Sequence, residues 1–117
     1  MAYVDGFVIP IPKKNIKAYK KMAELGCKTW MKYGAISYFE CVGDDLKTKM
    51  GLPFPKMCKL KSGETVVFAY IVFKSKTHRD QVNKKVMKYF DSLGEEMPML
   101  FDMKRFAYGG FKVLVQD

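Results

Sequence analysis

The segment from 64 to 73, ETVVFAYIVF, is apolar on both sides of any strand that it can form. Side chains alternate between the two faces of a β-strand, and a sheet with one face in water carries polar residues at alternate positions. Here both alternating sets are apolar. One set is Val67, Ala69, Ile71 and Phe73, and the other is Val66, Phe68, Tyr70 and Val72. The folded protein must therefore cover both faces of this strand.

Hydrophobic periodicity along the rest of the chain predicts elements in the order β-α-β-β-α-β. Strands are expected at 3–11, 35–42, 64–73 and 103–115, helices at 13–33 and 76–90, a long irregular loop at 44–62 and a short turn or helical fragment at 91–99. The Gly109–Gly110 pair in the last strand predicts a bulge or a close backbone approach. This order is the ferredoxin-like split βαβ arrangement, an α+β fold. We expect one domain, 1–117, with two helices on one face of a four-stranded antiparallel sheet.

The second sheet face then lacks cover, because no helix remains in the chain to shield it. A second copy of the chain, packed sheet against sheet, is the most economical cover. We therefore expect a homodimer in which two sheets form a dimeric α/β barrel. The alternative is that the loop at 44–62 folds over this face.

The net charge of +9 suggests a nucleic-acid partner, and its basic residues gather on the predicted helix at 13–33. The outer face of that helix carries Lys13, Lys17, Lys20, Lys21 and Lys28, with Glu24. Such a face is most often a solvated surface. The third strand lacks the basic–glycine opening of RNA-binding sheets, and a closed dimer would prevent base stacking on the sheet. Any nucleic-acid contact is then expected to be non-specific and steeply salt-dependent.

The composition also limits the compartment and the cofactors. No apolar run is long enough to cross a membrane, and the start MAYVDGFVIPIP lacks the basic region of a signal peptide. The three cysteines, Cys27, Cys41 and Cys58, match no zinc or redox spacing, which favours free thiols in the cytosol. With a single histidine no metal site is expected, and no motif requires a cofactor. We therefore expect a cytoplasmic protein without a membrane, metal or cofactor partner.

The stretch His78-Arg79-Asp80, followed by Asn83, superficially matches a kinase catalytic loop. A kinase needs the asparagine five residues after the aspartate, a glycine-rich loop and a second metal-binding aspartate, none of which occurs here. A helix start explains the stretch better, with Ser75 or Thr77 as the capping residue. Asp80 then lies in the first turn, where the helix dipole favours a negative charge. His78 is expected at the edge of the buried helix face, with contact to a ligand as the alternative.

A set of motifs in a fixed order carries a resemblance to a known family. They are YVDGFV at 3–8, ECVGDD at 40–45, FP at 54–55, ETVVFAYIVF at 64–73, HRDQVNKKVM at 78–87 and FDMKRFAYGGFKVLV at 101–115. Together they resemble the YbaA-like family of domains of unknown function (domain of unknown function 1428). The resemblance implies a dimeric α/β barrel but no reaction, since related barrels include small monooxygenases, isomerases and stress-response proteins. Some family members carry a label that names signal-recognition-particle RNA.

This chain differs from the family pattern in two places. Tyr70 stands where a tryptophan is common, and the stretch LKTKMGL at 46–52 is more basic.

Polar residues on otherwise apolar strands are the candidates for chemistry, because burying them without partners is costly. Asp5 and Glu40 are of this kind, and Arg105 or Lys104 is expected to supply a cation for Asp5. With His78, the candidate site residues are Asp5, Glu40, His78 and Arg105. The predicted pocket between sheet and helices, or between sheets, has the walls Phe7, Trp30, Tyr38, Phe68 and Tyr108. The alternative is a set of ion pairs that only close the fold or the dimer.

Three functions follow from these observations. The first is a small protein that binds or transforms a small molecule in the predicted pocket. The second is a structural or regulatory dimer without catalysis, and the third is a basic RNA-binding module. Acid–base chemistry would require Asp5 and Glu40 to lie close together, and the sequence does not decide whether the chain is an enzyme.

Overall fold

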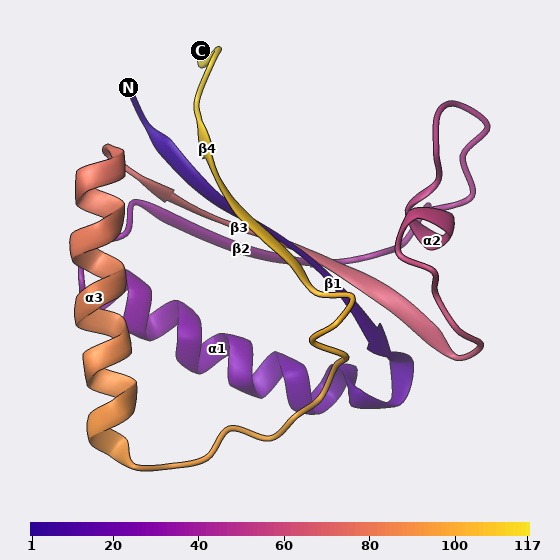
Figure 1. Ribbon diagram of the computed structural model, residues 1–117, viewed down its shortest axis with the longest axis horizontal. Coiled ribbons are helices and arrows are strands. Elements are labelled where there is room, and N and C mark those ends of the chain that lie inside the picture. Colours follow the sequence, from indigo (N-terminus) through magenta and orange to yellow (C-terminus); the bar gives the residue numbers. More distant parts are fainter.

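The computed structural model describes residues 1–117, and its elements follow the predicted order (Figure 1). The strands are β1 (Tyr3–Pro12), β2 (Ser37–Val42), β3 (Glu64–Phe73) and β4 (Ala107–Lys112). The helices are the 3-10 turn η1 (Lys13–Asn15), α1 (Ile16–Lys32), the short α2 (Phe54–Met57) and α3 (Lys76–Leu93). The predicted α+β fold with a ferredoxin-like order of strands and long helices is confirmed.

The sheet is antiparallel in the order β2-β3-β1-β4, so β1 and β3 form its central pair as predicted. Phe7 of β1 and Glu40 of β2 both lie opposite Ala69 of β3. Residues opposite each other in an antiparallel pair share a face. The side chains of Asp5 and Tyr38, each two residues from these, therefore project from the same face of the sheet.

Both long helices pack on this face, with α1 running along the sheet and α3 crossing near one end (Figure 1). The core beneath α1 consists of Ile9, Ile11, Tyr19, Val67 and Ala69. The core beneath α3 consists of Ala35, Ile71, Phe73, Val82 and Val86. The helices turn their lysines outward: Lys13, Lys17, Lys20, Lys21 and Lys28 are all exposed. One of the two predicted sets of β3 side chains is thus completely buried by the helices.

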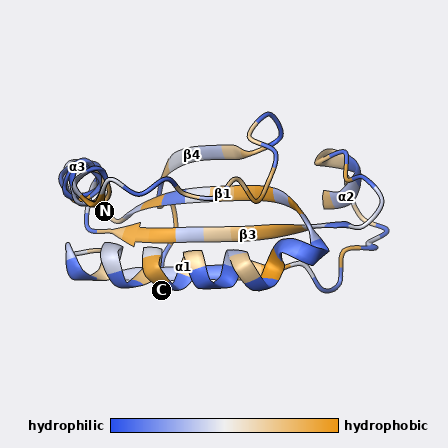
Figure 2. Cartoon of the chain, turned by 90° about the horizontal axis from the view of Figure 1, so that it is seen from below, coloured by the Kyte–Doolittle hydropathy of each residue, from blue (hydrophilic) through white to orange (hydrophobic).

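The opposite surface of the sheet, called the open face below, remains uncovered. It consists of Val4, Gly6 and Val8 of β1, Ser37, Phe39 and Cys41 of β2, Phe68, Tyr70 and Val72 of β3, and Ala107, Gly109 and Phe111 of β4. Phe39, Phe68 and Phe111 are 49%, 46% and 60% exposed. Figure 2 shows how strongly apolar β3 is compared with α3.

The loop at 44–62 does not fold over the open face, so this alternative is wrong. It extends beyond one end of the sheet and contains α2 (Figure 1). Both ends of the loop lie near the start of β3: Gly43, just before it, donates its N–H to the carbonyl of the buried Val66, and the Lys61 carbonyl accepts the N–H of Glu64. The phenylalanines farther along the face stay exposed because the loop leads away from them.

Three local predictions are corrected. β4 begins only at Ala107, because the preceding residues form a turn around the side chain of Asp102. α3 continues to Leu93 and is ended by Gly94 in the left-handed conformation (φ 63°), a position that glycine fills without strain. The Gly109–Gly110 pair produces no bulge, since the pairing of β4 with β1 is continuous.

None of the helices is both long enough and apolar enough to span a membrane.

Candidate functional site

Asp5 lies on the central strand β1 with its side chain almost completely buried. Arg79 of α3 donates from Nη1 to Asp5 Oδ1 at 2.7 Å, and Asn83 donates from Nδ2 to Oδ2 at 3.1 Å. Both partners come from α3, one helical turn apart. The expectation that Arg105 or Lys104 pairs with Asp5 is therefore wrong. The cation is Arg79, which belongs to the His78-Arg79-Asp80 stretch.

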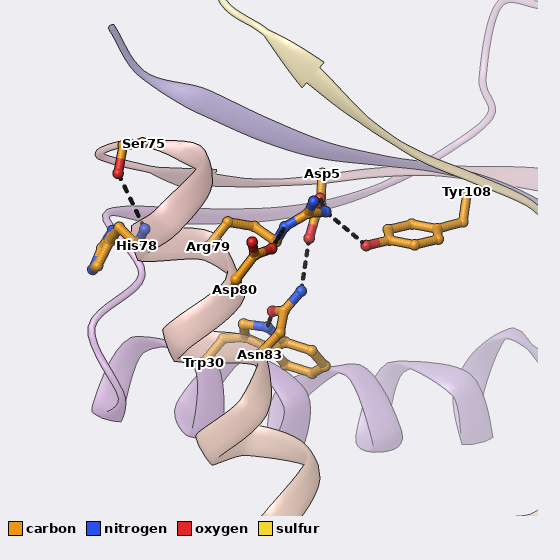
Figure 3. Close-up of polar contacts among 8 residues, drawn as sticks. All are labelled: Asp5, Trp30, Ser75, His78, Arg79, Asp80, Asn83 and Tyr108. Carbon is orange, nitrogen blue, oxygen red and sulfur yellow. Dashed lines mark hydrogen bonds and ion pairs between the residues drawn. The ribbon is translucent and has the colours of Figure 1, made fainter.

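Arg79 is held from several sides (Figure 3). Its Nη1 also contacts the Tyr108 hydroxyl at 3.1 Å, its Nε donates to Asp80 at 2.8 Å, and its guanidinium lies 4.9 Å from the centre of the Tyr3 ring. Burial acts to lower the pKa of Arg79, but Asp5, Asp80 and Tyr108 together outweigh this and the pKa is raised. The guanidinium therefore stays charged at every relevant pH.

Asn83 extends the network to α1. Trp30 donates from its indole Nε1 to Asn83 Oδ1 at 2.9 Å. Strand β1, helix α3 and helix α1 are thus joined through one set of polar groups, named here the Asp5 network: Asp5, Arg79, Asn83, Trp30 and Tyr108. No buried side-chain polar atom is left without a partner. The network is complete within the chain, which fits a structural role of positioning Trp30.

His78 lies at the start of α3 and apart from these groups (Figure 3). Its Nδ1 accepts the Lys74 backbone N–H at 2.9 Å, and its own backbone N–H donates to Ser75 Oγ at 3.1 Å. The ring packs edge-on against Phe73. The predicted helix start is confirmed, with Ser75 as the capping residue, and both hydrogen bonds of His78 belong to it. The expectation that Asp80 lies in the first turn is wrong, because α3 begins at Lys76 and its first turn holds no acidic residue.

Glu40 is half-buried on β2 and is held by two phenols. Tyr19 of α1 donates to Glu40 Oε1 at 2.6 Å, and Tyr38 donates to Oε2 at 2.7 Å. Burial, together with the hydrogen bond and charge of Glu40, raises the pKa of both tyrosines far above the ordinary value. Both phenols therefore remain neutral hydrogen-bond donors. No lysine, arginine or histidine forms an ion pair with Glu40. This group of three is named the Glu40 bridge.

The Glu40 bridge separates two hollows. The inner cavity, of about 150 Å³, lies between the sheet and the helices and is lined by Phe7, Ile9, Tyr19, Met22, Trp30, Tyr38, Glu40, Ala69, Ile71, Phe101 and Phe106. The outer groove, of about 350 Å³, lies between α1 and the edge strand β2. Only the residues of the Glu40 bridge line both hollows. They therefore form the wall between them.

The inner cavity brings together some of the predicted pocket residues and not others. Phe7, Trp30, Tyr38 and Glu40 all line it. Tyr108 does not line it but stacks on Phe7, with 4.9 Å between the ring centres. Placing Phe68 in the same pocket was wrong, because neighbouring residues of a strand alternate and Phe68 projects from the open face.

Seven of the eleven residues that line the cavity were not predicted for the site, among them Tyr19 and two phenylalanines. Phe101 and Phe106 come from the segment between α3 and β4, and their rings stack at 5.6 Å. Asn15 Nδ2 anchors this segment by donating to the Leu100 carbonyl at 2.8 Å. The strand predicted at 103–115 includes Phe106 but not Phe101, and neither side chain was expected in the pocket.

Arg105 serves a different part of the fold from the one predicted. It donates to both carboxylate oxygens of Glu64, at 2.7 and 2.8 Å, and to Asp102 at 2.9 Å. Glu64 begins β3 and lies opposite Pro12, at the far end of β1 from Asp5. At about 3.3 Å per residue this places the two sites on the order of 23 Å apart. Arg105 therefore anchors the segment before β4 to the start of β3.

The two candidate carboxylates, Asp5 and Glu40, share no hydrogen-bond partner. No group of three or more histidine, cysteine, aspartate or glutamate side chains is placed to hold a metal ion. Cys27, Cys41 and Cys58 are free thiols, and Cys27 and Cys41 line the outer groove. The chemistry available at the inner cavity is thus that of one carboxylate, two phenols and aromatic rings.

Comparison with known proteins identifies the family. Residues 2–103 match the family described as protein of unknown function (DUF1428). The chain is 36% identical to "Uncharacterized protein YbaA" of Escherichia coli (strain K12) over 119 aligned positions, covering all of both chains, and equally similar to the protein of that name in Shigella flexneri. Among solved structures, a de novo designed protein, Foldit4, aligns over 99% of this chain with a TM-score of 0.45 and 10% identity. The chain therefore belongs to the DUF1428 family of proteins of unknown function.

Proposed function

We propose that this protein works as a homodimer whose subunits each bind a small molecule in the inner cavity. The observation that carries the proposal is the half-buried Glu40 carboxylate, which faces an aromatic cavity without a cationic partner. Ligand pockets are typically apolar hollows with a few placed polar groups. The Asp5 network does not have this character, because Arg79 already compensates its charge.

The surroundings of the cavity suit a binding site better than a solid core. Its walls come from β1, α1, β2, β3 and the segment before β4, so a ligand would contact three strands and one helix at once. The Asp5 network fixes Trp30 from behind, and the stacked pair Phe101 and Phe106 closes another side. Fixed walls reduce the entropy that a protein loses when a ligand binds.

Binding is proposed rather than catalysis. A pair of carboxylates working as general acid and base must both reach the reacting group. Asp5 and Glu40 have separate partners on separate elements, and Asp5 is not among the residues that line the cavity.

The dimer is proposed from the open face. Its twelve positions carry no charged side chain, although 28% of the whole chain is charged. A face without charge can meet its own copy without repulsion, whereas a polyanion would require lysines or arginines there. Phe111 lies across Gly6 and leaves a hollow of about 220 Å³ next to Phe68, into which a partner side chain can pack.

Trp30 supplies a direct test of the cavity, because it is the only tryptophan of the chain and lines the cavity wall. Titrating the wild-type protein with toluene is expected to change its tryptophan fluorescence in a saturable way. The variant Ala69→Leu fills the cavity from its floor and is expected to abolish the change. Ala18→Leu makes the same substitution at an exposed position of α1 and serves as the control.

A wild-type protein whose tryptophan fluorescence shows no saturable response to toluene would contradict the proposed binding function. An equal response in the wild-type protein and in Ala69→Leu would also contradict it, since the ligand would then lie elsewhere.

A further inference from the structure

The charge of the inner cavity identifies the class of ligand that it favours. Glu40 is its only acidic residue, and no lysine, arginine or histidine lines it. The phenols of Tyr19 and Tyr38 stay protonated because their pKa values are raised. The cavity therefore carries a negative charge that nothing inside the chain neutralises. A carboxylate that has been moved out of water is stabilised most by a cation that can also donate hydrogen bonds to it.

The walls of the cavity favour the same kind of ligand. Six aromatic side chains line it: Phe7, Tyr19, Trp30, Tyr38, Phe101 and Phe106. The faces of aromatic rings attract cations, and an aromatic enclosure is a known way to bind substituted ammonium groups. The apolar body of such a ligand would also pack against these rings.

The size of the cavity limits the ligand further. A dry apolar cavity of roughly 150 Å³ holds a molecule such as benzene, and the inner cavity measures about 150 Å³. A single ring therefore fills it. A polar group attached to that ring must point to the Glu40 bridge, because every other lining side chain is apolar or has its polar atom bound elsewhere.

The carboxylate of Glu40 can accept the additional hydrogen bond. Each carboxylate oxygen can accept two hydrogen bonds, and each now accepts one, from Tyr19 or from Tyr38. An ammonium group can therefore bind beside the phenols or displace one of them. Displacement would open the wall towards the outer groove, where Lys20 and Glu24 line the mouth and leave no excess of positive charge.

The net charge of +9 acts against a cationic ligand in solution. The lysines that produce it lie on exposed surfaces, where their field is screened over about 8 Å at physiological salt. Lys20 lines the outer groove together with Glu40, but only Glu40 also lines the cavity, so its field there outweighs that of the lysines.

We propose that the inner cavity selects small organic ammonium ions with a single apolar or aromatic ring, and that Glu40 is the group that recognises the ammonium. This inference rests on the proposed binding function and adds the charge of the ligand to it. The recognition is a non-covalent ion pair with hydrogen bonds.

Three probes of nearly equal shape test the charge preference: benzylammonium, benzyl alcohol and benzoate. Their dissociation constants at neutral pH are measured from the fluorescence of Trp30 with wild-type protein. We expect benzylammonium to bind at least tenfold more tightly than benzyl alcohol, and benzoate to bind most weakly. The variant Glu40→Gln keeps the shape of the side chain but removes its charge. It is expected to weaken benzylammonium binding at least tenfold and to leave benzyl alcohol within about threefold.

Glu24→Gln is the matched control, since Glu24 lines the outer groove but not the cavity. It is expected to change none of the three dissociation constants by more than twofold. If Glu40→Gln does not fold, as judged by circular dichroism, the order of the three probes on the wild-type protein decides alone.

Equal affinity of the wild-type protein for all three probes, or tighter binding of benzoate, overturns the inference even when toluene binds. An unchanged benzylammonium affinity in folded Glu40→Gln also overturns it. These results would leave the binding function intact, whereas the toluene titration tests that function by itself.

Discussion

Asp5 and Glu40 project from the same face of the sheet, yet their carboxylates have different kinds of partner. Asp5 has a guanidinium at 2.7 Å, whereas Glu40 has only neutral phenols. A buried carboxylate with a cationic partner holds a fold together, and removing the partner is costly. A carboxylate with neutral partners keeps attraction for a further cation. The difference between the two residues separates a structural network from a candidate binding site.

Gly26 and Gly110 show how much space these clusters need. A Cβ at Gly26 of α1 would lie 2.9 Å from the Tyr38 hydroxyl, and one at Gly110 of β4 would lie 3.0 Å from Arg79 Nη1. A glycine in the middle of a helix costs about 1 kcal/mol relative to alanine. Here the absence of a side chain at Gly26 leaves room for the Tyr38 hydroxyl, which can then reach Glu40 between the sheet and α1. The close approach predicted for the Gly109–Gly110 pair is confirmed at Gly110.

The pair formed by Glu64 and Arg105 predicts a pH dependence of stability. The hydrogen bonds from Arg105 lower the pKa of Glu64 from its ordinary value of 4.5 to about 2. The folded state thus binds this proton less readily than the unfolded state, so the stabilisation is complete above about pH 4.5 and is lost as the pH falls towards 2. We expect the midpoint of thermal unfolding to decrease over this window, as followed by circular dichroism.

In the variant Arg105→Gln the midpoint should be lower at neutral pH, and its difference from wild type should shrink as the pH approaches 2. Lys28→Gln removes one positive charge from an exposed position outside any ion pair and should give a constant offset or none. A difference between Arg105→Gln and wild type that does not change with pH would disprove the assignment.

At the level of elements, the segment between α3 and β4 has more influence on the cavity than its irregular backbone suggests. It is fixed at one point by Asn15, which binds the Leu100 carbonyl, and at another by the Arg105 pair with Glu64. Phe101 lies between these anchors and Phe106 directly follows the second, and the two rings line the cavity and stack on each other. The cavity therefore depends on a segment whose shape comes from contacts with distant parts of the chain.

The start of α3 predicts the effect of one capping residue. Ser75 Oγ accepts the backbone N–H of His78 at 3.1 Å, which satisfies a donor that the helix leaves unpaired. Ser75→Ala is expected to reduce the free energy of unfolding by about 1 kcal/mol, measured by urea denaturation. Thr77→Ala, at an exposed position in the first turn, should change it by less than about 0.5 kcal/mol. Equal effects of the two substitutions would show that Ser75 is not the cap.

At the level of the whole molecule, the sheet has one face covered by α1 and α3 and one face uncovered. The uncovered face presents phenylalanines about half exposed, and a contiguous apolar surface of this kind marks an interaction site. A second copy provides a matching surface by symmetry, because a two-fold axis places the same residues on both sides. The proposed dimer would therefore bury the second apolar set of β3 just as the helices bury the first.

The dimer has a simple physical test. Light scattering should report a particle of twice the chain mass of 13.5 kDa at micromolar concentration. Phe68→Lys places a charge on a central strand of the open face and is expected to shift the protein to the monomer. Met87→Lys makes a similar change at a comparably exposed residue of α3 and should leave the dimer intact. A wild-type monomer at this concentration would rule out the proposed assembly.

The order of the elements and the two faces of β3 could be predicted because they depend on local patterns. Whether Val67 and Phe68 point to opposite sides follows from the alternation of any strand, and the period of 3.6 residues separates the lysines of α1 from its apolar side. The capping role at the start of α3 is equally local, since Ser75 and His78 are close in the chain. The sequence alone therefore determined the fold class and the presence of a second apolar sheet face.

The partners of the polar residues were decided only by the tertiary structure. Asp5 meets Arg79 across 74 positions of the chain, and Glu64 meets Arg105 across 41. Such contacts depend on the crossing of α3 over the sheet and on the path of the segment before β4. Periodicity records which side of its own element a residue occupies, but not which distant element arrives there. For this reason Glu40 could be nominated from the sequence, whereas the two phenols that hold it and the aromatic cavity that it faces could be found only in the folded molecule.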